Sequence, residues 1–404
     1  MYRNSQFLMP ILLLMVILPM LATDAYLPVI RSMGESFDIY DSSLTDTLTS
    51  YMLGYSLSLL LAGVLADIYG RRIISIAGIS IFAVSSVGCF FASTIEQLIV
   101  WRFFQALGGG CGTLIARIIV RDRFDLQSQV RVLGYLATGL VVSPILGPIL
   151  GAYISAYFGW RAIFLALALL SLFVLILLCI CMRETLLKQD RIRGYQFGTV
   201  LMQYLQLLRD WEFVFHTMVI SFAWAVYFAF LSSSPALIQH YYRVTPIEYG
   251  YIFSATICGF ILGTLFIRWK IAALELRSLI FMAGVIVFIS SLLLYILAIL
   301  EVKSLPALLA FVFCALFGIG IIFPATQAGV TKPFRNNFGL ISGLFYSTEM
   351  FFGAICGYIL SLSSTITWAI TSLVMLISAC CVVLLLLLDR VYGLKYQSKA
   401  INNL

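Results

Sequence analysis

The chain has 404 residues, of which 62% are hydrophobic and 11% are charged, and its mean hydropathy is +1.04. Water-soluble domains are close to half apolar and about a quarter charged. The composition therefore excludes a soluble enzyme or binding domain and indicates an integral membrane protein. The net charge of +7 is spread over short loops and forms no basic stripe, so nucleic acid is not an expected partner.

Cysteine and histidine show no pattern of metal or disulfide chemistry. The nine cysteines lie in apolar segments without the spacing of a disulfide framework or a zinc site, and His216 and His240 are isolated. We interpret the cysteines as small packing residues. The sequence also contains no glycine-lysine loop for phosphate and no catalytic constellation. We therefore predict no metal, no cofactor and no enzymatic activity.

Twelve apolar runs follow one another along the chain, and each is long enough, at about 20 residues, for a helix to cross a bilayer. Their expected bounds are 7–29, 44–66, 73–93, 97–119, 131–155, 161–182, 212–236, 248–268, 277–299, 305–328, 338–361 and 365–388. The first run exceeds the apolar core of a signal peptide and carries Asp24 where a cleavage site needs small residues, so we expect it to be retained.

Lysine and arginine are distributed unevenly between the connections. With the N-terminus in the cytoplasm, twenty lie on the cytoplasmic side, four lie outside, and one lies within a run. This asymmetry predicts a multi-pass protein with both termini in the cytoplasm. The longest connection divides the runs equally. We expect a six-helix bundle over 1–182, a cytoplasmic linker with a surface helix over 183–211, and a second six-helix bundle with a short cytoplasmic tail over 212–404.

A charged segment, Gly63-Val-Leu-Ala-Asp67-Ile-Tyr-Gly70-Arg71-Arg72, joins the second and third runs. Gly70 permits a tight turn, and an acid beside two bases can hold neighbouring helices in one conformational state. An ordinary turn is the alternative. The segment resembles the loop G-x-L-a-D-r-x-G-R-[RK] of the major facilitator superfamily. This resemblance implies an all-α membrane protein with twelve transmembrane helices in two six-helix bundles, and it implies that this loop is a conformational latch.

Further motifs extend the resemblance. Arg102-Phe-Phe-Gln105 is similar to the family's R-x-x-Q-G-x-G, although Ala106 and Leu107 precede the glycines. The run 131–155 is similar to G-x8-G-x3-G-P-x-x-G-G, a pattern that marks antiporters. Gly134, Gly147, Pro148 and Gly151 match this pattern, Ser143 and Ala152 replace two of its glycines, and Pro144 lies in the same segment. Small residues allow close helix packing in lipid and prolines remove backbone donors. We expect this helix to bend, pack against the opposite bundle and seal a cavity; packing alone is the alternative.

Two short segments narrow the resemblance. Asp24-Ala-Tyr-Leu-Pro28 and Ser232-Ser-Ser-Pro235 are similar to the bicyclomycin-resistance (Bcr/CflA) branch of the drug:proton antiporters with twelve helices.

Asp24, Arg102 and Glu349 are the ionisable residues expected inside the runs and not at their ends. Such residues are costly in a bilayer and usually face a cavity or one another. Asp24 and Arg102 are expected at similar depth, which permits a pair without establishing it. Glu349 is expected to lie near the midplane of the bilayer. Its carboxyl group is expected to ionise mainly when a cationic substrate is bound. The alternatives are an interfacial Asp24, an Arg102 bound to backbone carbonyls and a Glu349 that is only a satisfied hydrogen-bonding group.

Aromatic and amide side chains on the same runs are candidates for lining a site for a flat amphipathic ligand, although packing is the alternative for each. They are Tyr26, Tyr51, Tyr55, Gln105, Tyr227 and Tyr346.

Together these features predict a proton-coupled transporter that exports small amphipathic organic compounds across a bacterial inner membrane by alternating access. Its expected partners are its substrate, protons and lipid, and it is expected to be a monomer. Asp24 and Glu349 are expected to alternate between protonated and substrate-engaged states, with Arg102 tuning Asp24. Two alternatives stay open: a dedicated exporter of one endogenous metabolite such as a siderophore, and a transport-dead receptor or sensor.

Overall fold

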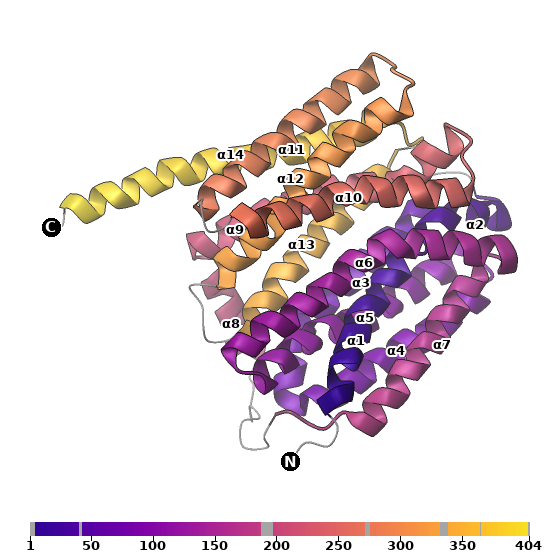
Figure 1. The fold of residues 1–404 in the computed structure, drawn as a ribbon, viewed down its shortest axis with the longest axis horizontal. Coiled ribbons are helices and arrows are strands. Elements are labelled where there is room, and N and C mark those ends of the chain that lie inside the picture. Colours follow the sequence, from indigo (N-terminus) through magenta and orange to yellow (C-terminus); the bar gives the residue numbers. More distant parts are fainter. Residues whose placement is uncertain are drawn as a thin grey trace.

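The computed structural model describes residues 5–39, 43–186, 197–270, 275–331, 338–363 and 365–402, and the regular elements in these ranges are all helices. Figure 1 shows two groups of helices side by side, the first coloured indigo to magenta and the second pink through orange to yellow. The predicted all-α membrane protein is confirmed: eleven helices in the described part are long and apolar enough to span a bilayer.

The first bundle contains α1 (Ser5–Asp24), α3 (Ser43–Tyr69), α4 (Arg71–Phe91), α5 (Ile95–Arg123), α6 (Leu126–Phe158) and α7 (Arg161–Cys181). Local chemistry separates them. The side chain of Thr94 caps α5 by accepting from the backbone N–H of Gln97, and Asp125 caps α6 in the same way. Gly159, at φ 81°, ends α6. In α6 the described apolar stretch Val142–Phe158 is shorter than the spans of the other helices.

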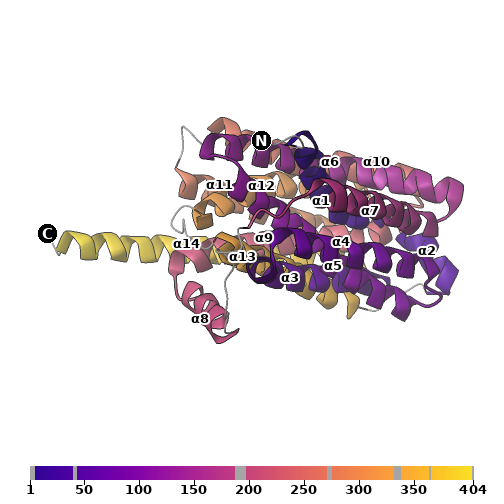
Figure 2. The ribbon, with the colours of Figure 1, turned by 90° about the horizontal axis from the view of Figure 1, so that it is seen from below.

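The second bundle contains α9 (Trp211–Ser234), η2 (Pro235–His240), α10 (Pro246–Lys270), α11 (Leu276–Ile299), α12 (Leu305–Thr331), α13 (Phe338–Ser361) and α14 (Trp368–Asn402). The last helix projects beyond the bundle toward the C-terminus (Figure 1). In the linker, residues 187–196 lie outside the described residues. Figure 2 shows the linker helix α8 (Phe197–Leu207) outside both bundles, and the hydroxyl of Tyr204 joins it to α3 by donating to the Leu60 carbonyl at 2.9 Å.

The first span differs from the expected single helix over 7–29. Helix α1 ends at Asp24, and the chain continues through η1 (Leu27–Val29) into α2 (Ile30–Phe37). Pro28 explains the break, because it has no N–H to donate and disfavours the helical conformation at Leu27. Asp24 therefore lies at a helix end inside the protein, where its side chain is only 5% exposed.

Two helix pairs join the bundles. Helix α3 packs along α13, and α6 packs antiparallel to α10, where Ser254 donates to the Ile145 carbonyl at 2.7 Å. Helix α6 begins just after α5, whose Asp122 contacts Arg71 beside the turn between α3 and α4. Because α10 runs antiparallel to α6, the end of α10 lies at this same face. We call this the Gly70 face, and the opposite face, which carries α2 and η2, the α2 face.

Candidate functional site

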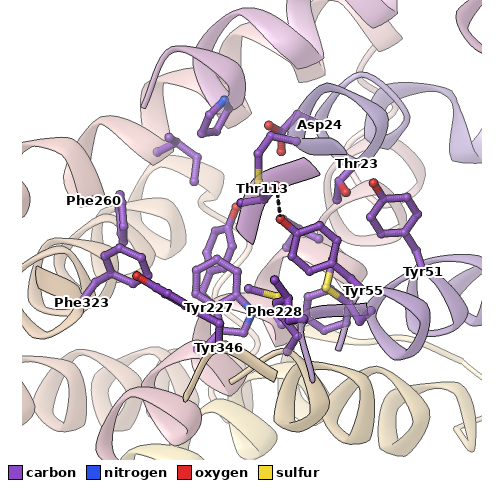
Figure 3. A pocket seen from close by; sticks show the side chains of 18 of the residues that line it. Thr23, Asp24, Tyr51, Tyr55, Thr113, Tyr227, Phe228, Phe260, Phe323 and Tyr346 are labelled. Carbon is purple, nitrogen blue, oxygen red and sulfur yellow. Dashed lines mark hydrogen bonds between the residues drawn. The ribbon is translucent and has the colours of Figure 1, made fainter. Parts of the chain in front are cut away.

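A cavity lies between the two bundles, and both contribute to its walls (Figure 3). Most of the lining is aromatic or aliphatic, with methionines from α1, α3 and α13. The lining residues are Met20, Thr23, Asp24, Tyr51, Met52, Tyr55, Leu59, Thr113, Leu114, Arg117, Pro144, Trp224, Tyr227, Phe228, Leu231, Ile257, Phe260, Thr264, Arg268, Phe323, Tyr346 and Met350. Arg268 lies near the end of α10, so the cavity extends toward the Gly70 face.

Asp24 is the one carboxylate among these lining residues. Ser143 of α6, which occupies a glycine position of the family motif, donates its hydroxyl to Asp24 Oδ2 at 2.7 Å. Gly147, one turn further along α6, leaves room for this approach: an added Cβ would lie 2.6 Å from Asp24 Cβ. The break in α1 and the small residues of α6 thus hold the carboxylate at the cavity wall.

Arg102 lies fully buried, behind the cavity wall. Its guanidinium carbon is 4.2 Å from the ring centre of Tyr51 and 4.5 Å from that of Tyr26. It donates to the carbonyl of Ala22 at 3.0 Å and to the side-chain oxygen of Gln105 at 2.7 Å. Although both side chains are described, no ion pair joins Arg102 to Asp24, so the permitted pair is not formed in this structure.

Four of the candidate lining residues reach the cavity: Tyr51, Tyr55, Tyr227 and Tyr346. Tyr55 donates to Thr113 at 2.8 Å, the hydrogen bond drawn in Figure 3. Tyr26 and Gln105 are not among the lining residues. Tyr26 shares a hydrogen bond of 2.6 Å with Thr47, and Gln105 donates to Ser86 at 2.8 Å, so both support Arg102 instead.

Glu349 does not line the cavity, which departs from the expected direct contact with substrate. Its side chain has 0% exposure, and its neighbours Tyr346 and Met350 form the wall. Neither carboxylate oxygen has a hydrogen-bond partner among the described residues. Glu349 is therefore not the satisfied hydrogen-bonding group of the alternative interpretation either.

Arg117 of α5 is a cavity residue that the sequence interpretation missed. Its position close to the end of the run 97–119 groups it, from sequence alone, with the twenty bases expected on the cytoplasmic side. The structure places its guanidinium over the ring of Tyr346, 4.4 Å from the ring centre, and thus against the opposite bundle. A second arginine fifteen positions after Arg102 on one apolar helix was the signal available in the sequence.

The charged turn between α3 and α4 forms a network inside the first bundle, which we call the Arg71 cluster. Arg71 lies 2.7 Å from Asp67 and 3.2 Å from Asp122 of α5. The backbone N–H groups of Arg71 and Arg72 donate to Glu184, just after α7. Gly70 turns the chain at φ 105°. Gly63 lies apart from this network, where α3 packs against the Gly339 carbonyl of α13; a Cβ added there would meet it at 3.2 Å.

The motif residues of α6 divide between two neighbours. Gly147 and Gly151 pack against the break after α1, in the same bundle, and not against the opposite bundle as expected. Pro148 meets the opposite bundle through its carbonyl, 3.1 Å from a Cβ built on Gly250 of α10. An added Cβ on Gly134 would meet nothing within 4 Å.

Among the described residues, no group of three or more His, Cys, Asp or Glu side chains is placed to hold a metal ion.

Two helix bundles that enclose a cavity within a membrane-spanning fold define a transporter. The family model of the major facilitator superfamily matches residues 12–357, and the chain belongs to that superfamily.

Solved structures support the same fold. A bacterial homologue of the human lysosomal transporter Spinster, in an inward-facing and occupied conformation, superposes with a TM-score of 0.71 at 16% identity, covering 96% of each chain. The xylose transporter XylE from E. coli, in a partially occluded inward-open conformation, gives a TM-score of 0.73 at 12% identity and covers 95% of this chain and 97% of the other.

Relatives in sequence include a transporter and a multidrug resistance protein. The uncharacterised MFS-type transporter YdgK of Bacillus subtilis (strain 168) is 24% identical over 87% of this chain and 88% of its own length. The multidrug resistance protein MdtL of Escherichia coli (strain K12 / DH10B) is 30% identical over 40% of this chain and 41% of its own length.

Proposed function

We propose that the chain is a proton-coupled exporter of small amphipathic organic compounds, in the Bcr/CflA branch of the drug:proton antiporters. It works as a monomer in a bacterial inner membrane with both termini in the cytoplasm. The observation that carries this proposal is Asp24, a carboxylate on the wall of an otherwise mostly apolar and aromatic cavity between the bundles. The name of MdtL, a multidrug resistance protein, supports the substrate class.

The lining suits ligands of varied shape. Tyrosine and phenylalanine rings supply flat apolar surfaces, and methionine side chains adapt to irregular ligands. A carboxylate at such a wall binds either a proton or a cationic group of the substrate, because both neutralise the same charge. Competition between the two is sufficient for exchange. One charge moved across the membrane potential is worth about 2.3 kcal/mol per 100 mV.

The Arg71 cluster is proposed to set the rate of conformational exchange. It lies at the Gly70 face, away from the cavity lining, and braces α3, α4 and α5 as one unit. A change in this network is therefore expected to alter the turnover rate more than it alters substrate affinity.

The test is transport of a fluorescent cationic dye in inside-out membrane vesicles with an imposed pH gradient. We expect Asp24→Asn to abolish the pH-driven component, because an amide does not exchange a proton at this site. Asp38→Asn is the matched control, since Asp38 is exposed at the end of α2 and its left-handed backbone suits Asn. If Asp24→Asn transports the dye under the pH gradient at the rate of the unsubstituted protein, the proposal is overturned. Resistance of an overexpressing strain to a panel of unrelated compounds tests the breadth of substrates.

A further inference from the structure

The contact between α3 and α13 is built from small residues across the two bundles. A Cβ on Gly343 would lie 2.8 Å from the Leu59 carbonyl, and Ser56 donates to the Ser347 carbonyl at 2.8 Å. Small residues of this kind let helix backbones approach closely in a membrane. A charged or polar side chain that bridges α13 and the first bundle near Gly343 and Ser347 therefore affects how tightly the two bundles are held together.

Glu349 lies on α13 at this level, and its hydrogen-bonding capacity is unused. The carboxyl group is fully buried and both oxygens lack partners among the described residues. The nearby indole nitrogen of Trp224 of α9 is also unpartnered there, and it packs against Gly353, one turn after Glu349. An ionised carboxylate in this place is stable only with a counter-ion, because burial removes its hydration.

Arg117 is the cation placed to be that counter-ion. It belongs to the first bundle, its guanidinium lies over Tyr346 of the second, and Tyr346 and Glu349 are three residues apart on α13, hence neighbours on one face. Among the described side chains no carboxylate forms an ion pair with Arg117. Tyr346 and Glu349 are separated by about one helical turn, roughly 5 Å along α13, so Arg117 has to move its flexible side chain from the ring toward the carboxyl group to pair with it.

We propose that Arg117 and Glu349 form a proton-controlled lock between the two bundles. Ionised Glu349 draws the guanidinium from the Tyr346 ring and holds the bundles together at the Gly70 face. Protonation of Glu349 removes the charge, returns Arg117 to the aromatic wall and lets this face open. The lock rests on the proposed proton exchange and adds to Asp24 a second protonation site, outside the substrate cavity.

Among the titratable groups that the neighbouring helices place near Glu349, Arg117 is the one that carries a charge. Tyr55 of α3, Arg117 of α5 and Tyr346 of α13 lie within electrostatic range of the carboxyl group. The tyrosines are neutral in the working range of pH. In α9, His216 bonds to Glu212 near the helix start, and Tyr227 faces the cavity with Asp24. Helix α12 carries no acid, no base and no histidine.

The test measures the distance between the bundles as a function of pH. Spin labels are attached at Tyr69→Cys of α3 and Trp269→Cys of α10, in a background without the native cysteines. Both positions are exposed, at 53% and 74%, and both lie near the Gly70 face. We expect the mean distance in the unmodified background to lengthen when the pH falls from about 8 to about 5. Glu349→Gln should lose this shift and keep the long distance at every pH, and Arg117→Gln should lose it in the same way.

The controls separate the lock from the proposed function. Glu301→Gln, at an exposed turn, should retain the shift in distance. The lock is overturned if the pH-dependent shift in distance survives in Glu349→Gln or in Arg117→Gln. It is also overturned if the unmodified background shows no such shift. Both conclusions hold whatever the transport result for Asp24→Asn. Conversely, normal pH-driven transport by Asp24→Asn with a shift that depends on Glu349 overturns the proposed function and supports the lock.

Discussion

Arg102 is stabilised mainly by aromatic rings and not by a carboxylate. Its planar guanidinium lies against Tyr26 and Tyr51 while it donates to a carbonyl and an amide oxygen. Two of its donor nitrogens, Nε and Nη2, have no partner among the described residues. An arginine suits this arrangement because the delocalised cation is weakly hydrated and stacks on rings, whereas an ammonium group is compact and strongly hydrated.

Arg102→Lys therefore keeps the charge but loses the stacking. A desolvated cation–π contact is worth about 2 kcal/mol, so we expect the melting temperature in detergent to fall by several degrees and transport to fall with it. Arg161→Lys is the matched control. Arg161 also stacks on a ring, 4.3 Å from the centre of Trp160, but it is half-buried and should lose less. If both variants lose the same melting temperature and transport, burial does not make the stacking of Arg102 more stabilising than that of Arg161.

Helix α6 shows that glycines within one motif are not equivalent. A Cβ on Gly151 would collide with the carbonyl of Ala25, whereas a Cβ on Gly134 would meet nothing within 4 Å. The close approach between Gly151 and the Ala25 carbonyl fixes where the end of α1 lies against α6. It thereby places Asp24 beside Ser143.

Gly151→Ala should force α1 away from α6 and cost about 1–3 kcal/mol. Gly134→Ala should be neutral or slightly stabilising, because alanine favours a helix by up to about 1 kcal/mol over glycine. Thermal unfolding and dye transport measured on both variants test the difference. A destabilised Gly134→Ala together with an unaffected Gly151→Ala would contradict this account of the packing.

The helices were predictable because hydropathy and charge report directly on the bilayer, and these signals require no knowledge of neighbours. Contacts between helices were not predictable in this way. The partner of Gly147 and Gly151 depends on the break at Pro28. The position of Arg117 inside the protein depends on α5 continuing to Arg123, past the predicted end of the run at residue 119. Glu349 was identified as an intramembrane acid, but its orientation away from the cavity wall depends on the packing of α13.

At the scale of the whole molecule, the two faces differ. On the α2 face the bundles are joined by polar contacts: Arg31 donates to the Gln239 carbonyl at 3.1 Å, and the Gln239 side chain donates to the Pro28 carbonyl at 3.0 Å. Toward the Gly70 face the cavity extends to Arg268. The structure thus corresponds to a state that is closed at the α2 face, and alternating access requires these contacts to separate.

A reversible cross-link at the α2 face tests this requirement. A Cβ on Gly250 of α10 would lie 3.3 Å from Cα of Ile149 of α6, so the pair Gly250→Cys and Ile149→Cys falls within reach of a disulfide. In a background without other cysteines, oxidation should stop transport while substrate still binds from the Gly70 face, and a reducing agent should restore transport. Each single variant, treated with the same oxidant, is the control. Continued transport by fully cross-linked protein would show that α6 and α10 remain together throughout the cycle, and that the α2 face does not open by their separation.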